Sequence, residues 1–265
     1  MFKLKVFFAE FIGTFALVFI GASSGIVTGG DLVAVALAHG LTLAVFTYAY
    51  GYISGTHINP VVTLGLALQG VVKWGEALVS YWIPQFVGAI AAAFLLKTIL
   101  DPFAPEAFQG AMTIGALNAD YPYFAMVVEA LLTFFLVNTI LHTAVGGKGG
   151  QFSGLVVGLT YSIAILAGGP FTGASLNPAR TFGPALFTGD YKDAMSYLIF
   201  FLGPAIGSVM AVGAYQLFTS EPVQADDDMD EDFEEEANEE VEVEAVEESK
   251  PVRRKPAARK PAKKK

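Results

Sequence analysis

Two stretches of this sequence are built alike: residues 54–61, SGTHINPV, and residues 173–180, GASLNPAR. In each, a polar segment that contains glycine leads into Asn-Pro. An apolar run follows, over about 59–69 and about 177–187, which is too short to cross a bilayer. Asparagine is a preferred cap of a helix start, and proline suits the first helical turn. Each stretch therefore predicts a half-helix that enters a membrane and turns back.

The composition of the rest of the chain predicts a membrane protein, as the half-helices require. Hydrophobic residues make up 54% of the 265 residues and charged residues only 15%. A helix crosses the hydrocarbon core with roughly 20 mainly apolar residues. We expect an all-α membrane protein with two re-entrant half-helices and six transmembrane helices, over about 6–27, 32–53, 77–99, 122–144, 153–171 and 194–217.

The chain also repeats itself. Gly40-Leu41-Thr42 recurs as Gly158-Leu159-Thr160 at the same offset as the two Asn-Pro pairs, which gives repeats over about 6–99 and 122–217. Each repeat has three spans, an odd number, so the second repeat must be inverted in the membrane. The two loops then approach the midplane from opposite sides. Irregular backbone at that depth is tolerated only where it is buried in protein or lines a watery cavity, so a pore or a binding site is expected there.

Charge predicts the orientation and separates off a tail. Lysines 3, 5, 73 and 148 fall on one side of the spans while acidic residues dominate the other side, which predicts that both termini are cytoplasmic. Most of the net charge of −9 lies in residues 221–265, an acidic run followed by a basic one. Such a composition predicts a disordered cytoplasmic tail beyond a channel domain of residues 1–220. No address signal distinguishes the plasma membrane from a vacuole-like membrane.

Composition also excludes several classes of protein. The sequence has no cysteine, and therefore no disulfide, thiolate metal site or cysteine nucleophile. Its three histidines are scattered, and no carboxylate pair stands beside a nucleophile. We expect no enzyme activity, no metal, no cofactor and no nucleic-acid partner.

The paired motifs resemble the two Asn-Pro-Ala motifs of aquaporins, the major intrinsic proteins, and the likeness covers about residues 6–217. The motif residues are Asn59, Pro60, Val61, Asn177, Pro178 and Ala179. Val61 departs from the family's alanine, and we expect this to change packing near the pore centre more than its chemistry. The resemblance implies a homotetramer in membrane lipid, in which each subunit is a passive channel for water.

Helix dipoles provide a physical reason for excluding ions from such a channel. Each half-helix start carries about half a positive charge, and two such starts meeting at the midplane oppose cations, including protons. The amides of Asn59 and Asn177 are expected to donate hydrogen bonds to a passing oxygen.

A selectivity ring follows from the resemblance. Arg180 lies one turn into the second half-helix, where a permanent charge needs a partner or water. The family pattern places it in a ring with His39, Ile165 and Ala174, a set similar to that of plant tonoplast intrinsic proteins. Ammonia, urea, hydrogen peroxide and glycerol are then candidate solutes besides water. The alternative for His39 is a packing histidine whose polar atoms are satisfied within the helices.

Two other transport functions remain as alternatives. Glycerol-selective relatives carry Asp and Lys after the second motif, where this chain has Thr181 and Ala185. Phe200 and Phe201 also differ from the residues of glycerol facilitators, so we favour water over glycerol. A secondary transporter would need coupling groups at the midplane.

Three further features of the spans and loops carry predictions. The symmetric placement of Glu10 and Glu129, with the family pattern, favours carboxylates that brace the two loops. The resemblance places His57 in the cytoplasmic approach to the constriction. The glycine pairs 21/25, 154/158 and 203/207 are small-xxx-small patterns, from which we expect close helix packing.

Overall fold

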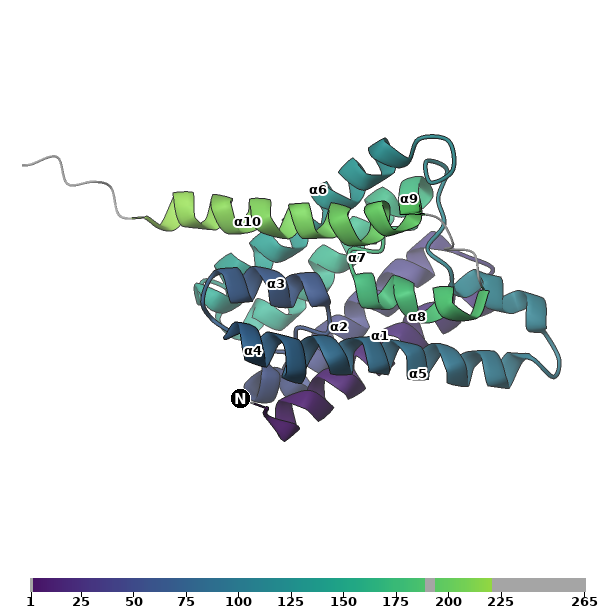
Figure 1. Cartoon of the computed structure of the whole chain (residues 1–265), viewed down its shortest axis with the longest axis horizontal. Coiled ribbons are helices and arrows are strands. Elements are labelled where there is room, and N and C mark those ends of the chain that lie inside the picture. Colours follow the sequence, from purple (N-terminus) through teal and green to yellow (C-terminus); the bar gives the residue numbers. More distant parts are fainter. Residues whose placement is uncertain (1, 189–193, 221–265) are drawn as a thin grey trace, which may run out of the picture. The chain divides into compact units, whose positions relative to one another are not determined.

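The six apolar runs form six long helical spans within residues 2–188 and 194–220, the residues that this computed structural model describes. The spans are Leu4–Val27, Leu32–Ser54, Trp74–Leu100, Pro122–Val145, Gly150–Thr172 and Met195–Thr219. The first is α1 (Leu4–Val27) and the second is α2 (Leu32–Ser54), which Figure 1 draws in purple and blue. The predicted fold class is confirmed, while the predicted tail at 221–265 lies outside the described residues.

The two half-helices form where the Asn-Pro pairs predict them. They are α3 (Pro60–Leu68) and α8 (Pro178–Thr188), and each is too short to span a bilayer (Figure 1). Between residues 2 and 188 and from 194 to 220 the secondary structure is entirely helical. Backbone polar groups at membrane depth are paired within helices, except at the half-helix starts and in the two loops, where other groups must satisfy them.

Three of the six spans contain π-helical turns, which the sequence did not predict. The third span runs through α4 (Trp74–Glu76), the π turn η1 (Ala77–Trp82) and α5 (Ile83–Leu100). The other elements are η2 (Pro105–Ala111), α6 (Pro122–Ile140), the π turn η3 (Leu141–Val145), η4 (Gly150–Phe152), α7 (Ser153–Thr172), α9 (Ala194–Tyr197), the π turn η5 (Leu198–Leu202) and α10 (Gly203–Thr219). Such turns occur often at functional sites. The side chains of Tyr81 and Trp82 in η1 reach the two ends of the first loop, where they donate to the carbonyls of Ser54 and Pro60.

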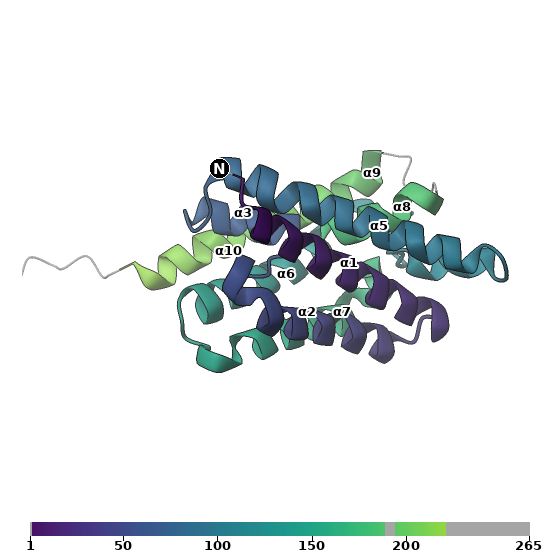
Figure 2. The same ribbon diagram turned by 90° about the horizontal axis from the view of Figure 1, so that it is seen from below.

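Helix packing follows the repeat. The helix α1 packs on α5, its counterpart α6 packs on α10, and α2 packs on α7 across the pair of repeats (Figure 2). A Cβ on Gly88 of α5 would lie 2.5 Å from the carbonyl oxygen of Phe11, and a Cβ on Gly207 of α10 would meet the carbonyl of Ala130 in the same way. Glycine is therefore required at equivalent close approaches in both repeats.

The three glycine patterns do not all pack alike. Gly203 and Gly207 face carbonyl groups of α6, and Gly158 faces the carbonyl group of Gly40 on α2, as expected for close helix contact. The pattern of Gly21 and Gly25 also lies at close contacts, but with different partners. The atoms nearest to Gly21 are those of the His39 ring, and Gly25 faces a carbonyl in η2 rather than another spanning helix.

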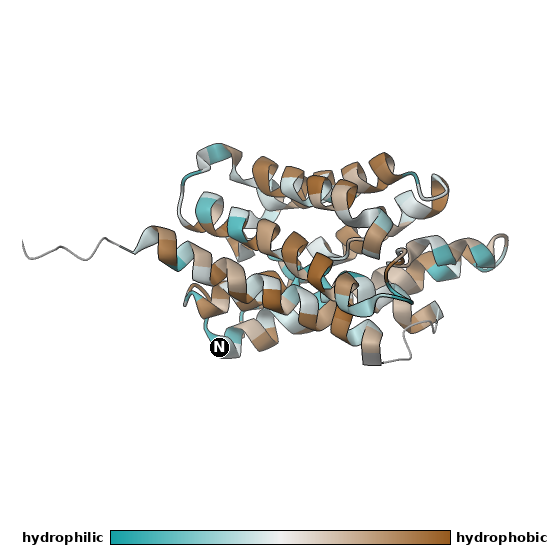
Figure 3. Cartoon of the chain, turned by 90° about the horizontal axis from the view of Figure 1, so that it is seen from above, coloured by the Kyte–Doolittle hydropathy of each residue, from teal (hydrophilic) through white to brown (hydrophobic). Residues whose placement is uncertain are grey.

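Apolar side chains cover the outside of the helices. Figure 3 shows hydrophobic residues along the long helices and hydrophilic ones mainly at their ends and in the loops. The apolar window of α2 is only 33% buried, against 56% for α1. Its exposed large apolar side chains are Val33, Leu37, Leu41, Val45, Tyr48 and Tyr52. This face of α2 is therefore available to lipid or to another subunit.

Candidate functional site

Each half-helix starts on its asparagine. The side-chain oxygen of Asn59 accepts a hydrogen bond from the Val61 amide at 3.0 Å. That of Asn177 accepts from the amides of Ala179 and Arg180, at 3.0 and 3.2 Å. These bonds satisfy N–H groups that have no partner within the helix. Both half-helix starts are buried, so the positive ends of two helix dipoles lie inside the protein.

The same two asparagines tie the loops to each other. Asn59 Nδ2 donates to the Leu176 carbonyl and Asn177 Nδ2 donates to the Ile58 carbonyl, both at 2.8 Å. An amide group carries two N–H donors. The second N–H of each asparagine has no hydrogen-bond partner in the described part of the chain, so half of the expected donor capacity remains for a solute.

The loop backbone is held in an unusual conformation. Among the described residues, four other than glycine have positive φ, namely Thr56 (51°), Ile58 (39°), Ala174 (45°) and Leu176 (54°). Positive φ is uncommon outside glycine, and for a β-branched residue it is a genuine outlier. Such a conformation persists only where surrounding groups fix it.

Two carboxylates hold the loop backbone in this conformation. Glu10 accepts hydrogen bonds from the amides of His57 (2.9 Å) and Ile58 (2.7 Å), from Ser54 Oγ (2.6 Å) and from Gln85 Nε2 (2.8 Å). Glu129 accepts from the amides of Ser175 (2.9 Å) and Leu176 (2.8 Å) and from Thr172 Oγ1 (2.7 Å). Each carboxylate is fully buried and binds one backbone N–H with each oxygen, so both are occupied by the loops.

Two cavities open at different parts of the site. One of about 40 Å³ is lined by both Asn59 and Asn177 together with His57 and Tyr161. A larger one of about 260 Å³ is lined by Arg180 and Ile165, with Gly21 and Gly173. The larger cavity touches neither His39 nor Ala174 directly. The two half-helix starts thus line one cavity, and the guanidinium group lines the other.

Arg180 and His39 are in direct contact. Arg180 Nε donates to His39 Nε2 at 3.1 Å, and the other ring nitrogen of His39 lies 2.8 Å from the Val35 carbonyl oxygen. A carbonyl only accepts, so Nδ1 carries the hydrogen and Nε2 is the acceptor. No carboxylate of the described residues lies within ion-pair distance of Arg180. Ile165 and Ala174 are buried nearby on α7 and in the second loop.

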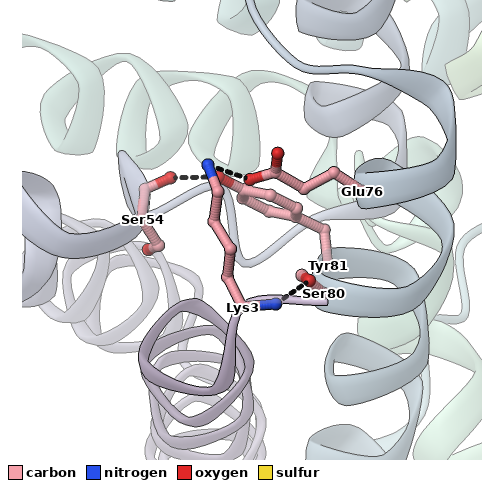
Figure 4. Close-up of polar contacts among 5 residues, drawn as sticks. All are labelled: Lys3, Ser54, Glu76, Ser80 and Tyr81. Atoms are coloured by element: carbon pink, nitrogen blue, oxygen red, sulfur yellow. Dashed lines mark hydrogen bonds and ion pairs between the residues drawn. The ribbon is translucent and has the colours of Figure 1, made fainter. Parts of the chain in front are cut away.

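The Tyr81 hydroxyl binds the first loop at its start, where α2 ends. The Tyr81 hydroxyl donates to the Ser54 carbonyl at 2.9 Å, and the Tyr81 ring stacks on His57 with centroids 4.3 Å apart. Next to it, Lys3 forms an ion pair with Glu76 at 2.7 Å, and its main-chain N–H donates to Ser80 Oγ at 3.0 Å (Figure 4). The start of α1 is thereby attached to the π turn that carries Tyr81.

Replacing Tyr81 by phenylalanine should destabilise the protein. The ring would still stack on His57, but the buried Ser54 carbonyl at the end of α2 would lose its partner, at a cost of about 1–3 kcal/mol. Thermal unfolding in detergent measures this, with the exposed Tyr123→Phe as the matched control. Equal unfolding temperatures for the two variants would show that the hydroxyl contributes nothing.

Some residues of the site escaped the sequence analysis. Gln85 on α5 is fully buried and donates to Glu10 and to Thr63 Oγ1, and Tyr161 on α7 donates to the Ser175 carbonyl at 2.9 Å. A polar side chain inside a span is itself a signal of function or of a hydrogen-bond network. Gln85 lies in the middle of the third apolar run, so its polar side chain there could have identified it from the sequence.

The fold and the site together define a class: an integral membrane protein of six spans whose two half-helices meet end to end inside it. Residues 1–215 match the family described as Major intrinsic protein. The chain belongs to the major intrinsic protein family.

Named relatives include both aquaporins and a glycerol facilitator. The chain is 40% identical to aquaporin AqpM of Methanothermobacter marburgensis, over 80% of this chain and 96% of that protein. It is 38% identical to aquaporin TIP2-1 of Arabidopsis thaliana, over 79% and 85%. It is also 36% identical to the glycerol uptake facilitator protein-like 6 of Lactiplantibacillus plantarum, over 82% and 100%.

A solved structure has the same fold. The X-ray structure of the aquaglyceroporin from Plasmodium falciparum superposes with a TM-score of 0.70, covering 80% of this chain and 95% of that one. The two sequences are 24% identical, so this likeness describes the fold alone.

Proposed function

We propose that the chain is a passive channel for water and small neutral solutes across a lipid bilayer. The observation that carries the proposal is the end-to-end meeting of α3 and α8. Their asparagines line one cavity and each keeps a free N–H for a passing oxygen. Relatives named as aquaporins and as a glycerol uptake facilitator support a channel of this kind. The positive ends of the two half-helices would oppose cations, including protons.

The narrowest part of the pathway is proposed to be the ring of His39, Ile165, Ala174 and Arg180. The contact of Arg180 with His39 supports a polar wall, and Ile165 and Ala174 supply an apolar one. His57 is proposed to line the approach on the Asn59 side, because it borders the cavity there. Water is favoured over glycerol, with ammonia, urea and hydrogen peroxide as further candidate solutes.

A secondary transporter is disfavoured by the same geometry. Coupling would need an acidic group that can bind an ion near the midplane. Glu10 and Glu129 are the acids deep in the described spans, and their oxygens are engaged by loop donors. Neither is open to a coupling ion without dismantling a loop.

Assembly and orientation belong to the same proposal. The exposed apolar face of α2 supports a homotetramer in membrane lipid, and lysines 3, 5, 73 and 148 on one side of the spans support cytoplasmic termini. Residues 1–220 are the proposed channel domain and 221–265 the proposed tail. Native mass spectrometry of the detergent-solubilised protein tests the tetramer. Protease accessibility of a C-terminal tag in intact cells tests the orientation.

Stopped-flow light scattering on proteoliposomes tests transport itself. Wild-type protein should speed shrinkage in an impermeant solute, and the Arg180→Ala variant should speed the re-swelling in urea and glycerol several-fold, since it removes the cation from the ring. Vesicles that shrink no faster than empty ones would contradict the proposal. Rapid re-swelling of the wild type in glycerol would favour the glycerol-facilitator alternative.

A further inference from the structure

Gly21 faces the imidazole of His39. A Cβ built on Gly21 would lie 2.5 Å from Cε1 and 2.6 Å from Cδ2 of His39, and closer still to Nε2. Those distances are shorter than any non-bonded contact between carbon atoms. The ring can lie against α1 only because residue 21 has no side chain.

The imidazole cannot turn aside without losing a partner. Its Nδ1–H donates to the Val35 carbonyl on α2, and its Nε2 accepts from Arg180 Nε on α8. His39 is 1% exposed, and both of its ring nitrogens are engaged within the protein. A side chain at residue 21 would therefore push the ring away from α1 and break its contact with Arg180.

Gly21 and Arg180 line the same cavity of about 260 Å³. The guanidinium group is directed by its single Nε bond to His39, and its Nη groups have no hydrogen-bond partner in the described part of the chain. Those groups remain free to donate to a solute. The position of the guanidinium therefore depends on how closely the imidazole packs against α1. The width of the selectivity ring depends on it in turn.

We propose that Gly21 is a specificity-determining positioning residue of the channel. Because residue 21 has no side chain, the His39 ring fits against α1 and there holds the Arg180 guanidinium at the wall of the pore. This inference rests on the proposed function. It concerns a residue that contacts neither asparagine motif and acts on the solute through His39.

A double-mutant cycle in proteoliposomes tests it. Gly21→Ala should lower water permeability per channel severalfold, because a methyl group added at a closely packed site displaces the imidazole that holds Arg180. In a His39→Ala background the same substitution should change permeability less than twofold (about the error of the assay), because the ring that it would displace is gone. The ratio of urea to water permeability is measured for all four proteins.

Gly213→Ala is the matched control. Gly213 lies in α10 with no atom near its would-be Cβ, so this variant gains the same helix propensity without a contact. Thermal unfolding of each variant separates transport from folding.

The outcomes distinguish the inference from the proposed function. If wild-type protein conducts no water, the proposed function fails. If the wild type conducts and Gly21→Ala conducts equally well, the inference about Gly21 is overturned. An equal loss in both backgrounds, with a lower unfolding temperature, would also overturn it, because Gly21 would then serve only the packing of α1.

Discussion

Replacing Glu10 or Glu129 by glutamine should unfold the loops even though the substitution changes neither shape nor volume. In each carboxylate one oxygen accepts one backbone N–H and the other oxygen accepts the next. A glutamine amide has one acceptor oxygen only. Whichever way it is turned, its NH₂ faces a buried backbone N–H, of His57 or Ile58 in one case and of Ser175 or Leu176 in the other.

The expected cost is about 1–3 kcal/mol for each unpaired N–H, and more because the lost acceptor is a carboxylate. Both variants should unfold at lower temperature in detergent and transport less water per inserted channel. Glu106→Gln, which changes an exposed carboxylate in η2, is the control. Should Glu10→Gln and Glu129→Gln unfold at the same temperature as that control, the two carboxylates do not hold the loops.

Valine in place of Gly158 should force α2 and α7 apart. A Cβ on Gly158 would lie 2.7 Å from the Ala44 Cβ, 3.0 Å from the Ala44 nitrogen and closer still to the Gly40 carbonyl oxygen. Two of these three atoms are backbone, so no change of rotamer relieves the overlap. The expected destabilisation is about 1–3 kcal/mol or more, since small-to-large changes in packed cores cost that much.

Gly213→Val provides the matched comparison, because it introduces the same β-branched residue into a helix where no atom lies nearby. The temperature at which each variant loses its folded elution peak in detergent measures the difference. A Gly158→Val protein as stable as Gly213→Val would mean that α2 and α7 do not need their close approach.

Much of the fold was predictable because its signals are local. A run such as 32–53, which forms the span Leu32–Ser54, is recognisable from apolar composition alone. The half-helix α3 is recognisable because Asn59 and Pro60 mark its start. The π turns were not predictable, since a run such as Ala77–Trp82 has the composition of an ordinary helix and differs only in what packs around it.

The contacts of the site were less accessible to sequence reasoning. The residues Asn59 and Arg180 were identified, but not that Asn59 binds the Leu176 carbonyl or that Arg180 binds His39, because these partners lie far away in the chain. The pattern Gly21 to Gly25 shows the limit most clearly. Its spacing is the same as that of Gly154 to Gly158. Gly21, however, faces a side-chain ring, whereas Gly158 faces a backbone carbonyl.

The hydrogen bonds between the two loops also mean that the first loop cannot reach its final structure until the second loop has been synthesised. Asn59 binds the carbonyl of a residue 117 positions later in the chain. A ribosome adding roughly 5–20 residues per second needs roughly 6–23 s to make that partner. For this interval Asn59 Nδ2 lacks the carbonyl to which it donates in the finished protein. A nascent chain arrested before Leu176 should therefore expose the first loop to chemical labelling that the finished protein resists.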